Sequence, residues 1–134
     1  MISINIFSRR EFIDLYKKTG NIHNQYYISI LPTGGPDGDP ILHPADNVIT
    51  LIFDDVLKDE LKSMLPIEDN MFMAKCFTVE QAKQLNKFIN NIKIPCVVNI
   101  HCVEGRSRSF AIARFLLETI THGNKLVYEL LKSA

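Results

Sequence analysis

Short apolar runs recur along the chain, separated by segments whose apolar residues follow helical spacing. Ser3–Phe7 alternates polar and apolar side chains, as a half-buried strand does. Tyr26–Leu31 is rich in strand-forming residues, and Val48–Phe53 and Cys96–Ile100 are apolar almost throughout. Near-continuous apolar runs are typical of strands in a parallel sheet that is covered on both faces. The pattern therefore predicts four short strands, the last two deeply buried.

Two helices are predicted from cap signals. Ser8 is a good N-cap for a helix over Arg9–Lys18. Thr78 and Gln81 have the spacing of a capping box, so a second helix is expected to begin there and to run to about Ile92. The apolar residues of that second helix recur at helical spacing: Val79, Ala82, Leu85, Phe88, Ile89 and Ile92.

Three more helices are expected, over Leu57–Leu65, from near Arg108 to about Thr121, and over Leu126–Leu131. The segment Pro32–Pro40 is rich in glycine and proline and is predicted to be a surface loop. Because helices separate the strands, we expect an α/β fold. It is a three-layer sandwich with a central, mostly parallel sheet of four or five strands flanked by helices.

Composition narrows the class of protein. A length of 134 residues fits a single domain, 1–134, and 46% apolar with 22% charged residues is ordinary for a soluble globular protein. The net charge is zero, which disfavours a broad basic surface for nucleic acid. No apolar run reaches the roughly 20 residues that span a bilayer, so no membrane partner is expected. Three cysteines do not make a disulfide scaffold, and they indicate a reducing, cytoplasmic setting.

The candidate chemistry lies in the segment from His101 to Ser109 (HCVEGRSRS), which joins the last predicted strand to a helix. Five residues separate Cys102 from Arg108, enough to curl backbone N–H groups around a tetrahedral phosphate. Gly105 permits a bend or a close approach, and the helix directs its positive end at the anion. The residues expected to bind substrate in this cradle are Val103, Glu104, Gly105, Arg106, Ser107 and Arg108.

Cys102 is the expected nucleophile. A helix N-terminus and nearby cations lower the pKa of a thiol from about 8.5, so a thiolate would be ready at neutral pH to attack phosphorus. Arg108 would hold two phosphate oxygens through its planar guanidinium. Ser109 would donate a hydrogen bond to the sulfur and ease its departure, whereas His101 is expected to hold the loop. Neither a metal nor an organic cofactor is required by this chemistry.

The string HCVEGRSRS matches the HC-x5-R-(S/T) signature of protein tyrosine phosphatases, and its form HC-x-x-G-x-S-R-S resembles the dual-specificity branch. The ISILP run, the LIFDD strand end and the NKLVYELL tail are similar to the small predicted tyrosine phosphatases of bacteria and phages. The resemblance implies a cysteine-dependent phosphatase that acts through a cysteinyl-phosphate intermediate. Its partners would be phosphorylated proteins or small phosphate esters, and RNA 5′-phosphates stay open as substrates.

The resemblance also implies an aspartate, on a loop after a preceding strand, that protonates the leaving oxygen and later activates water. The run VITLIF leads directly into Asp54 and Asp55, whose side chains alternate in direction. Asp55 is the expected acid and Asp54 the first alternative. The separation from Asp55 to Cys102 is longer than is usual in the dual-specificity branch, so Glu68 or Asp69 in the additional segment is a third candidate.

Two rival functions stay open. Rhodanese-like sulfurtransferases also use a cysteine in a loop, although they usually lack a His-Cys start with Arg-Ser at this spacing. A non-catalytic module that binds phosphoproteins is the other rival, and the intact set of Cys102, Arg108 and Asp55 argues against it.

The other cysteines have simpler roles. Cys96 precedes Cys102 on the same predicted strand by about 20 Å, too far for a disulfide, and is expected in the core. Cys76 is either a small apolar residue or a thiol that resolves an oxidised Cys102. Arg106 either contacts substrate or is a solvated charge, and the negative charge of Glu104 disfavours highly anionic inositol phosphates.

Overall fold

The computed structural model describes residues 2–54 and 78–120, in which strands and helices alternate along the chain. In chain order the elements are β1 (Ile2–Ser8), α1 (Arg9–Thr19), β2 (Gln25–Leu31), the short 3-10 helix η1 (Pro36–Gly38), β3 (Val48–Ile52), α4 (Val79–Asn90), β4 (Cys96–Cys102) and α5 (Ser107–Ile120). The helices expected over Leu57–Leu65 and Leu126–Leu131 lie outside the described residues.

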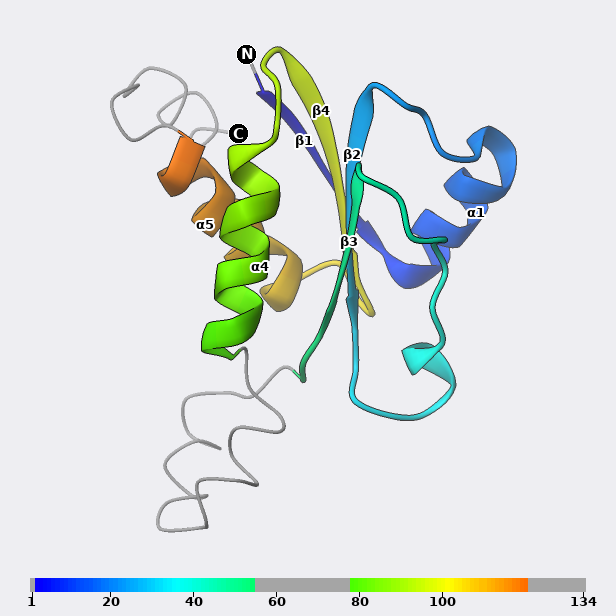
Figure 1. The fold of residues 1–134 in the computed structure, drawn as a ribbon. Coiled ribbons are helices and arrows are strands. Elements are labelled where there is room, and N and C mark those ends of the chain that lie inside the picture. Colours follow the sequence, from blue (N-terminus) through cyan, green and yellow to red (C-terminus); the bar gives the residue numbers. More distant parts are fainter. Residues whose placement is uncertain (1, 55–77, 121–134) are drawn as a thin grey trace, which may run out of the picture.

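The described strands form one sheet in the order β1-β4-β2-β3, and every neighbouring pair is parallel. Figure 1 shows α1 on one face of this sheet and α4 with α5 on the other. The predicted α/β sandwich with a parallel central sheet is therefore confirmed, with four strands in the described part of the chain.

Two capping boxes set where α1 and α4 begin. The Ser8 hydroxyl accepts from the Glu11 N–H and the Glu11 carboxylate accepts from the Ser8 N–H. Thr78 and Gln81 make the same exchange at the start of α4. These contacts satisfy N–H groups that have no acceptor inside a helix. Both predicted starts are confirmed. Val79 departs from the predicted apolar face, because at the first position of α4 it is 66% exposed.

Each face of the sheet has its own hydrophobic cluster. The larger one packs β2, β3 and β4 against α4 and α5, and its fully buried members include Ile28, Leu51, Leu85, Ile100 and Leu116. The smaller one lies under α1 and is formed by Phe12, Tyr27 and Leu42. Burial of apolar surface on both faces is what holds three layers together.

The two strands predicted to be covered on both faces differ. β4 pairs with β1 and β2, and it extends two residues past the predicted end, to Cys102. β3 pairs only with β2 among the described strands, and Ile52 is 51% exposed, so full coverage of β3 was a wrong prediction. Periodicity shows that a run is apolar, whereas its place at the edge depends on strand order.

A row of amides crosses the centre of the sheet. Asn99 on β4 is buried, and its Nδ2 donates to Gln25 Oε1 on β2 at 2.9 Å. Asn5 on β1 donates to Asn99 Oδ1 at 3.1 Å. A slip of one residue would leave these buried polar groups unpaired, so the row helps to fix the register of three strands. In this register Ser8 lies opposite Cys102.

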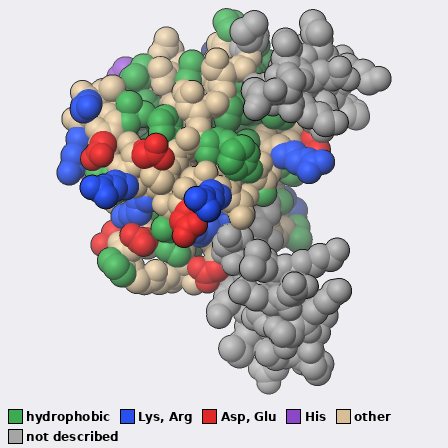
Figure 2. All heavy atoms as spheres, turned by 180° about the vertical axis from the view of Figure 1, so that it is seen from behind, with side chains coloured by type: hydrophobic (Ala, Val, Ile, Leu, Met, Phe, Trp, Pro, Cys, Tyr) green, Lys and Arg blue, Asp and Glu red, His purple; other side chains and the backbone are tan. Residues whose placement is uncertain are grey.

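The surface gives two further findings. Acidic and basic side chains are intermixed over the described part of the face shown in Figure 2, so that face carries no extended area of a single charge. Among the described residues, no helix has both the length and the apolar character needed to cross a membrane.

Candidate active site

Cys102 lies at the carboxyl end of β4, between β1 and β2 in the sheet. It is 2% exposed. A bend over residues 103–106 leads from it into α5. The carboxyl ends of the parallel strands meet at this edge (Figure 1), which is where α/β proteins place their ligands.

The loop that follows the cysteine is braced against the junction of β1 and α1. Gly105 has φ +69°, a left-handed conformation that other residues rarely adopt. A Cβ at this position would lie 2.7 Å from the carbonyl carbon of Phe7 and 2.7 Å from the nitrogen of Ser8. The N–H of Arg9 donates to the carbonyl of Val103 at 3.0 Å. The curvature expected of a phosphate cradle is therefore held by backbone contacts that only glycine permits.

The Cys102 sulfur lies among hydrogen-bond donors. Burial raises the pKa of the thiol, but hydrogen bonds from the Ser109 hydroxyl and from the N–H groups of Ser109, Arg106 and Gly105 together lower it below its ordinary value. These N–H groups belong to the loop and to the first turn of α5, where backbone donors lack partners inside the helix. Donors that stabilise a thiolate are also suited to an anionic ligand.

Ser109 is fully buried. Its Oγ has no hydrogen-bond acceptor within the described part of the chain, and the hydroxyl lies close enough to the Cys102 sulfur to lower the pKa of that thiol. No other described group competes for this donor, so it can serve the sulfur when negative charge develops there.

Arg108 is half-buried and reaches from α5 to the end of β3. Its Nη1 donates to the carbonyl of Phe53 at 3.1 Å, and it makes no other hydrogen bond to described residues. The contact fixes one edge of the planar guanidinium, and no described group competes with an anion for its other donors. The charge of Arg108 also contributes to lowering the pKa of His101, which shows that it lies close to the end of β4.

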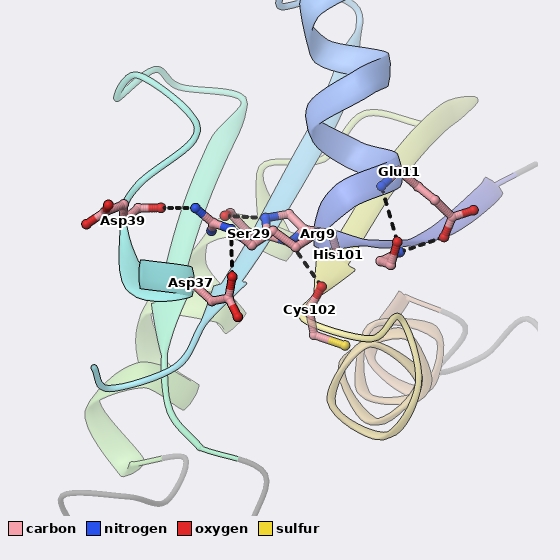
Figure 3. Close-up of polar contacts among 8 residues, drawn as sticks. Arg9, Glu11, Ser29, Asp37, Asp39, His101 and Cys102 are labelled. Atoms are coloured by element: carbon pink, nitrogen blue, oxygen red, sulfur yellow. Dashed lines mark hydrogen bonds and ion pairs between the residues drawn. The ribbon is translucent and has the colours of Figure 1, made fainter. Parts of the chain in front are cut away.

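His101 points away from the sulfur. Figure 3 shows it directed at Ser29 on β2, whereas the Cys102 sulfur points toward α5. Ser29 Oγ lies 2.6 Å from Nε2, and the Cys102 carbonyl oxygen lies 3.4 Å from Nδ1. Because a carbonyl can only accept, Nδ1 carries the proton and Nε2 accepts from Ser29. The ring of Phe12 stacks on the imidazole with the centroids 4.6 Å apart.

The buried imidazole is uncharged at neutral pH. Burial lowers the pKa of His101 to about 4, the charges of Arg9 and Arg108 add to the effect, and the hydrogen bond to the Cys102 carbonyl opposes it. Neither ring nitrogen faces the cradle, so His101 is placed to hold the backbone at the start of the loop. The expectation that it would act by hydrogen bonds agrees with these contacts.

Arg9 crosses the same edge of the sheet. Figure 3 shows it extending from the start of α1 toward Asp37 and Asp39. Its Nη2 donates to the Asp39 carbonyl at 2.9 Å, and its Nε lies 3.7 Å from the Asp37 carboxylate. Its side chain is 13% exposed, and among the described residues its Nη1 has no hydrogen-bond partner. The charge of this second arginine lies close enough to His101 to contribute to lowering its pKa.

Of the candidate acids, Asp54 lies among the described residues. Asp55, Glu68 and Asp69 lie outside the described residues. The Asp54 carboxylate accepts from the N–H of Thr33 at 3.0 Å and from its hydroxyl at 2.6 Å. Asp54 is thus engaged with the chain that follows β2.

The remaining residues of the predicted cradle form its rim. Val103 and Gly105 are half-buried, whereas Glu104, Arg106 and Ser107 are exposed. Both signs of charge are therefore presented to solvent at the mouth.

Of the two other cysteines, Cys96 lies among the described residues. Cys96 is a free thiol in the core, as predicted, and burial raises its pKa. Cys102 is also free, so the two form no disulfide. Cys76 lies outside the described residues.

Sequence reasoning missed three residues at this edge. Ser29, Thr33 and Arg9 reach the site because β2 lies beside β4 and because β1 delivers the start of α1 to the loop. A serine inside an apolar strand was the only local hint, since a buried hydroxyl needs a partner.

Comparison with models of protein families, with curated proteins and with solved structures finds no match.

Proposed function

We propose that this chain is a phosphomonoester hydrolase of the protein tyrosine or dual-specificity type, with Cys102 as its nucleophile. The observation that carries the proposal is the convergence of backbone N–H groups and the Ser109 hydroxyl on the Cys102 sulfur, which lowers the pKa of that thiol. Arg108 stands at the same strand ends. The resemblance of HCVEGRSRS to the phosphatase signature supports the same conclusion.

In the first step the Cys102 thiolate attacks phosphorus and the bond from phosphorus to the ester oxygen breaks. Arg108 and the loop N–H groups stabilise the charge on the phosphoryl oxygens. The leaving oxygen takes a proton from Asp55, the acid that the resemblance implies.

In the second step a water molecule gives a proton to Asp55 and attacks the cysteinyl phosphate. The bond from sulfur to phosphorus breaks and releases inorganic phosphate. Ser109 and the surrounding N–H groups stabilise the departing thiolate, because they already lower the pKa of that sulfur.

The substrates proposed are phosphorylated proteins and small phosphate esters. The mixed charges of the exposed rim residues Glu104 and Arg106, and of the face in Figure 2, do not favour a polyanionic partner. A reducing cytoplasm is the compartment that would keep the thiol of Cys102 free for attack.

The test is hydrolysis of p-nitrophenyl phosphate by the wild type, Cys102→Ser, Cys96→Ser and Asp55→Ala. We expect Cys102→Ser to be inactive, Cys96→Ser to keep most of the activity, and acid-quenched wild type to carry phosphate on the peptide that contains Cys102. Activity retained by Cys102→Ser would overturn the mechanism. Unchanged activity of Asp55→Ala would move the acid to another carboxylate.

Two controls separate the rivals. Sulfur transfer from thiosulfate without ester hydrolysis would identify a sulfurtransferase. Binding of a phosphopeptide with no turnover of any phosphate ester would identify a non-catalytic module.

A further inference from the structure

The residues that follow β3 are tied at the candidate site to α5 and to the chain that follows β2. The carbonyl of Phe53, the first residue after β3, accepts from Arg108 Nη1 at 3.1 Å. The next residue, Asp54, accepts from the Thr33 N–H at 3.0 Å and from the Thr33 hydroxyl at 2.6 Å. The N–H of Phe53 donates to the Leu31 carbonyl at 3.0 Å. The arginine expected to bind phosphate therefore rests on a carbonyl whose surroundings are fixed on both sides.

The planarity of the peptide bond makes these contacts act together. The Phe53 carbonyl belongs to the rigid unit that links Phe53 to Asp54. The bond to Leu31 fixes the chain before this unit, and the two bonds from Thr33 to the Asp54 carboxylate fix it afterwards. With both ends held, the carbonyl has one direction in which to accept a hydrogen bond, and that direction orients the guanidinium of Arg108.

The same contacts bear on the acid. A general acid must carry a proton on its carboxyl group before the reaction. Both oxygens of Asp54 instead accept hydrogen bonds from Thr33. These contacts suit a carboxylate that accepts hydrogen bonds and holds the backbone in place.

We propose that Asp54 and Thr33 are positioning residues for Arg108, which hold the Phe53 carbonyl in the direction that orients the guanidinium toward the phosphate of the substrate. This inference rests on the proposed function, because it concerns the binding of phosphate by Arg108. It assigns to Asp54 a role different from proton donation.

The test uses inorganic phosphate and two esters that differ in leaving group, p-nitrophenyl phosphate and phenyl phosphate. Wild type, Thr33→Val, Thr33→Ser, Asp54→Asn and Asp39→Asn are compared. Thr33→Val removes the hydroxyl but keeps the N–H, whereas Thr33→Ser keeps both donors. Asp39 is exposed on the same loop and contacts Arg9 only through its carbonyl among the described residues, so Asp39→Asn is the matched control.

We expect Thr33→Val and Asp54→Asn to weaken the binding of inorganic phosphate by roughly five- to tenfold, as the loss of a charge-assisted hydrogen bond would. KM should rise for both esters, and the ratio of kcat/KM between the esters should stay as in the wild type. Thr33→Ser and Asp39→Asn should bind phosphate like the wild type.

Two results would overturn the inference. Unchanged phosphate affinity in Thr33→Val would show that the hydrogen bonds between Thr33 and Asp54 do not position Arg108. A much larger loss on phenyl phosphate than on p-nitrophenyl phosphate in Asp54→Asn would show that Asp54 is the acid, because the poorer leaving group depends more on protonation.

Failure of the proposed function has a different signature. If the wild type hydrolyses neither ester but binds phosphate, the enzyme proposal fails while the affinities of Thr33→Val and Thr33→Ser still decide the positioning role. If the wild type binds no phosphate, both proposals are wrong.

Discussion

The buried, neutral His101 should make the fold sensitive to acid. Its pKa is about 4 in the folded chain, against 6.5 for a solvated histidine. As the pH falls, the unfolded chain takes up the proton first, so the stabilisation is complete above about pH 6.5 and is lost as the pH falls through about 4. Because the residue is fully buried, the whole difference counts, and the loss between pH 7 and pH 4.5 is about 2–3 kcal/mol.

Urea unfolding at pH 7, 5.5 and 4.5, followed by circular dichroism, would measure this loss. His101→Gln retains an amide that can donate to the Cys102 carbonyl, and it does not titrate. Its free energy of unfolding should fall by about 2–3 kcal/mol less than that of the wild type between pH 7 and pH 4.5. The carboxylates titrate in both proteins, so the difference isolates the imidazole.

His43→Gln, at an exposed position, is the control and should follow the wild type. The reasoning would be refuted if His101→Gln and the wild type lost the same free energy on acidification. Such a result would mean that the folded chain accommodates a charged imidazole at this site.

Three further predictions concern the loop and its support. Gly105→Ala should lose at least about 2 kcal/mol in urea unfolding, because its Cβ would overlap the backbone of β1, whereas Gly34→Ala, with open space around it, should not. Equal stability of the two variants would contradict the close approach. Ser29→Ala should lose about 1–3 kcal/mol, since a buried imidazole acceptor is left unpaired, and a thermal unfolding midpoint like that of the wild type would count against this pairing. Alkylation by iodoacetamide, followed by peptide mass spectrometry, should modify Cys102 at a pH below the ordinary thiol range and Cys96 far more slowly, and the reverse order would refute the pKa directions.

Local signals in the sequence were sufficient for the described strands and α-helices. Both helix starts were found from capping residues, because a cap contact spans three residues and depends on nothing distant. The buried strand β4 was predicted from its apolar run. Its last two residues, His101 and Cys102, were left out because they are polar or reactive in isolation. They extend the strand because β1 and β2 pair with it on both sides.

The partners of the site residues depend on strand order and were not readable. Nothing local indicates that Ser29 lies beside His101, which is 72 residues away, or that Thr33 clamps Asp54. The place of β3 at the edge of the described sheet was missed for the same reason, since an apolar run has the same appearance in the middle of a sheet and at its edge. The expected acid Asp55 lies outside the described residues and stays a prediction.

The pairing of β1 with β4 has a consequence for how reactivity arises during synthesis and folding. Contacts between these strands join residues as far as 94 positions apart, and contacts of such high contact order close late. Until these strands pair, Gly105 cannot pack against the backbone of β1. The N–H groups that donate to the Cys102 sulfur are therefore not yet held around it. In a nascent chain the donors that lower the pKa of Cys102 are therefore missing, and a lowered pKa of this thiol reports that β1 has paired with β4.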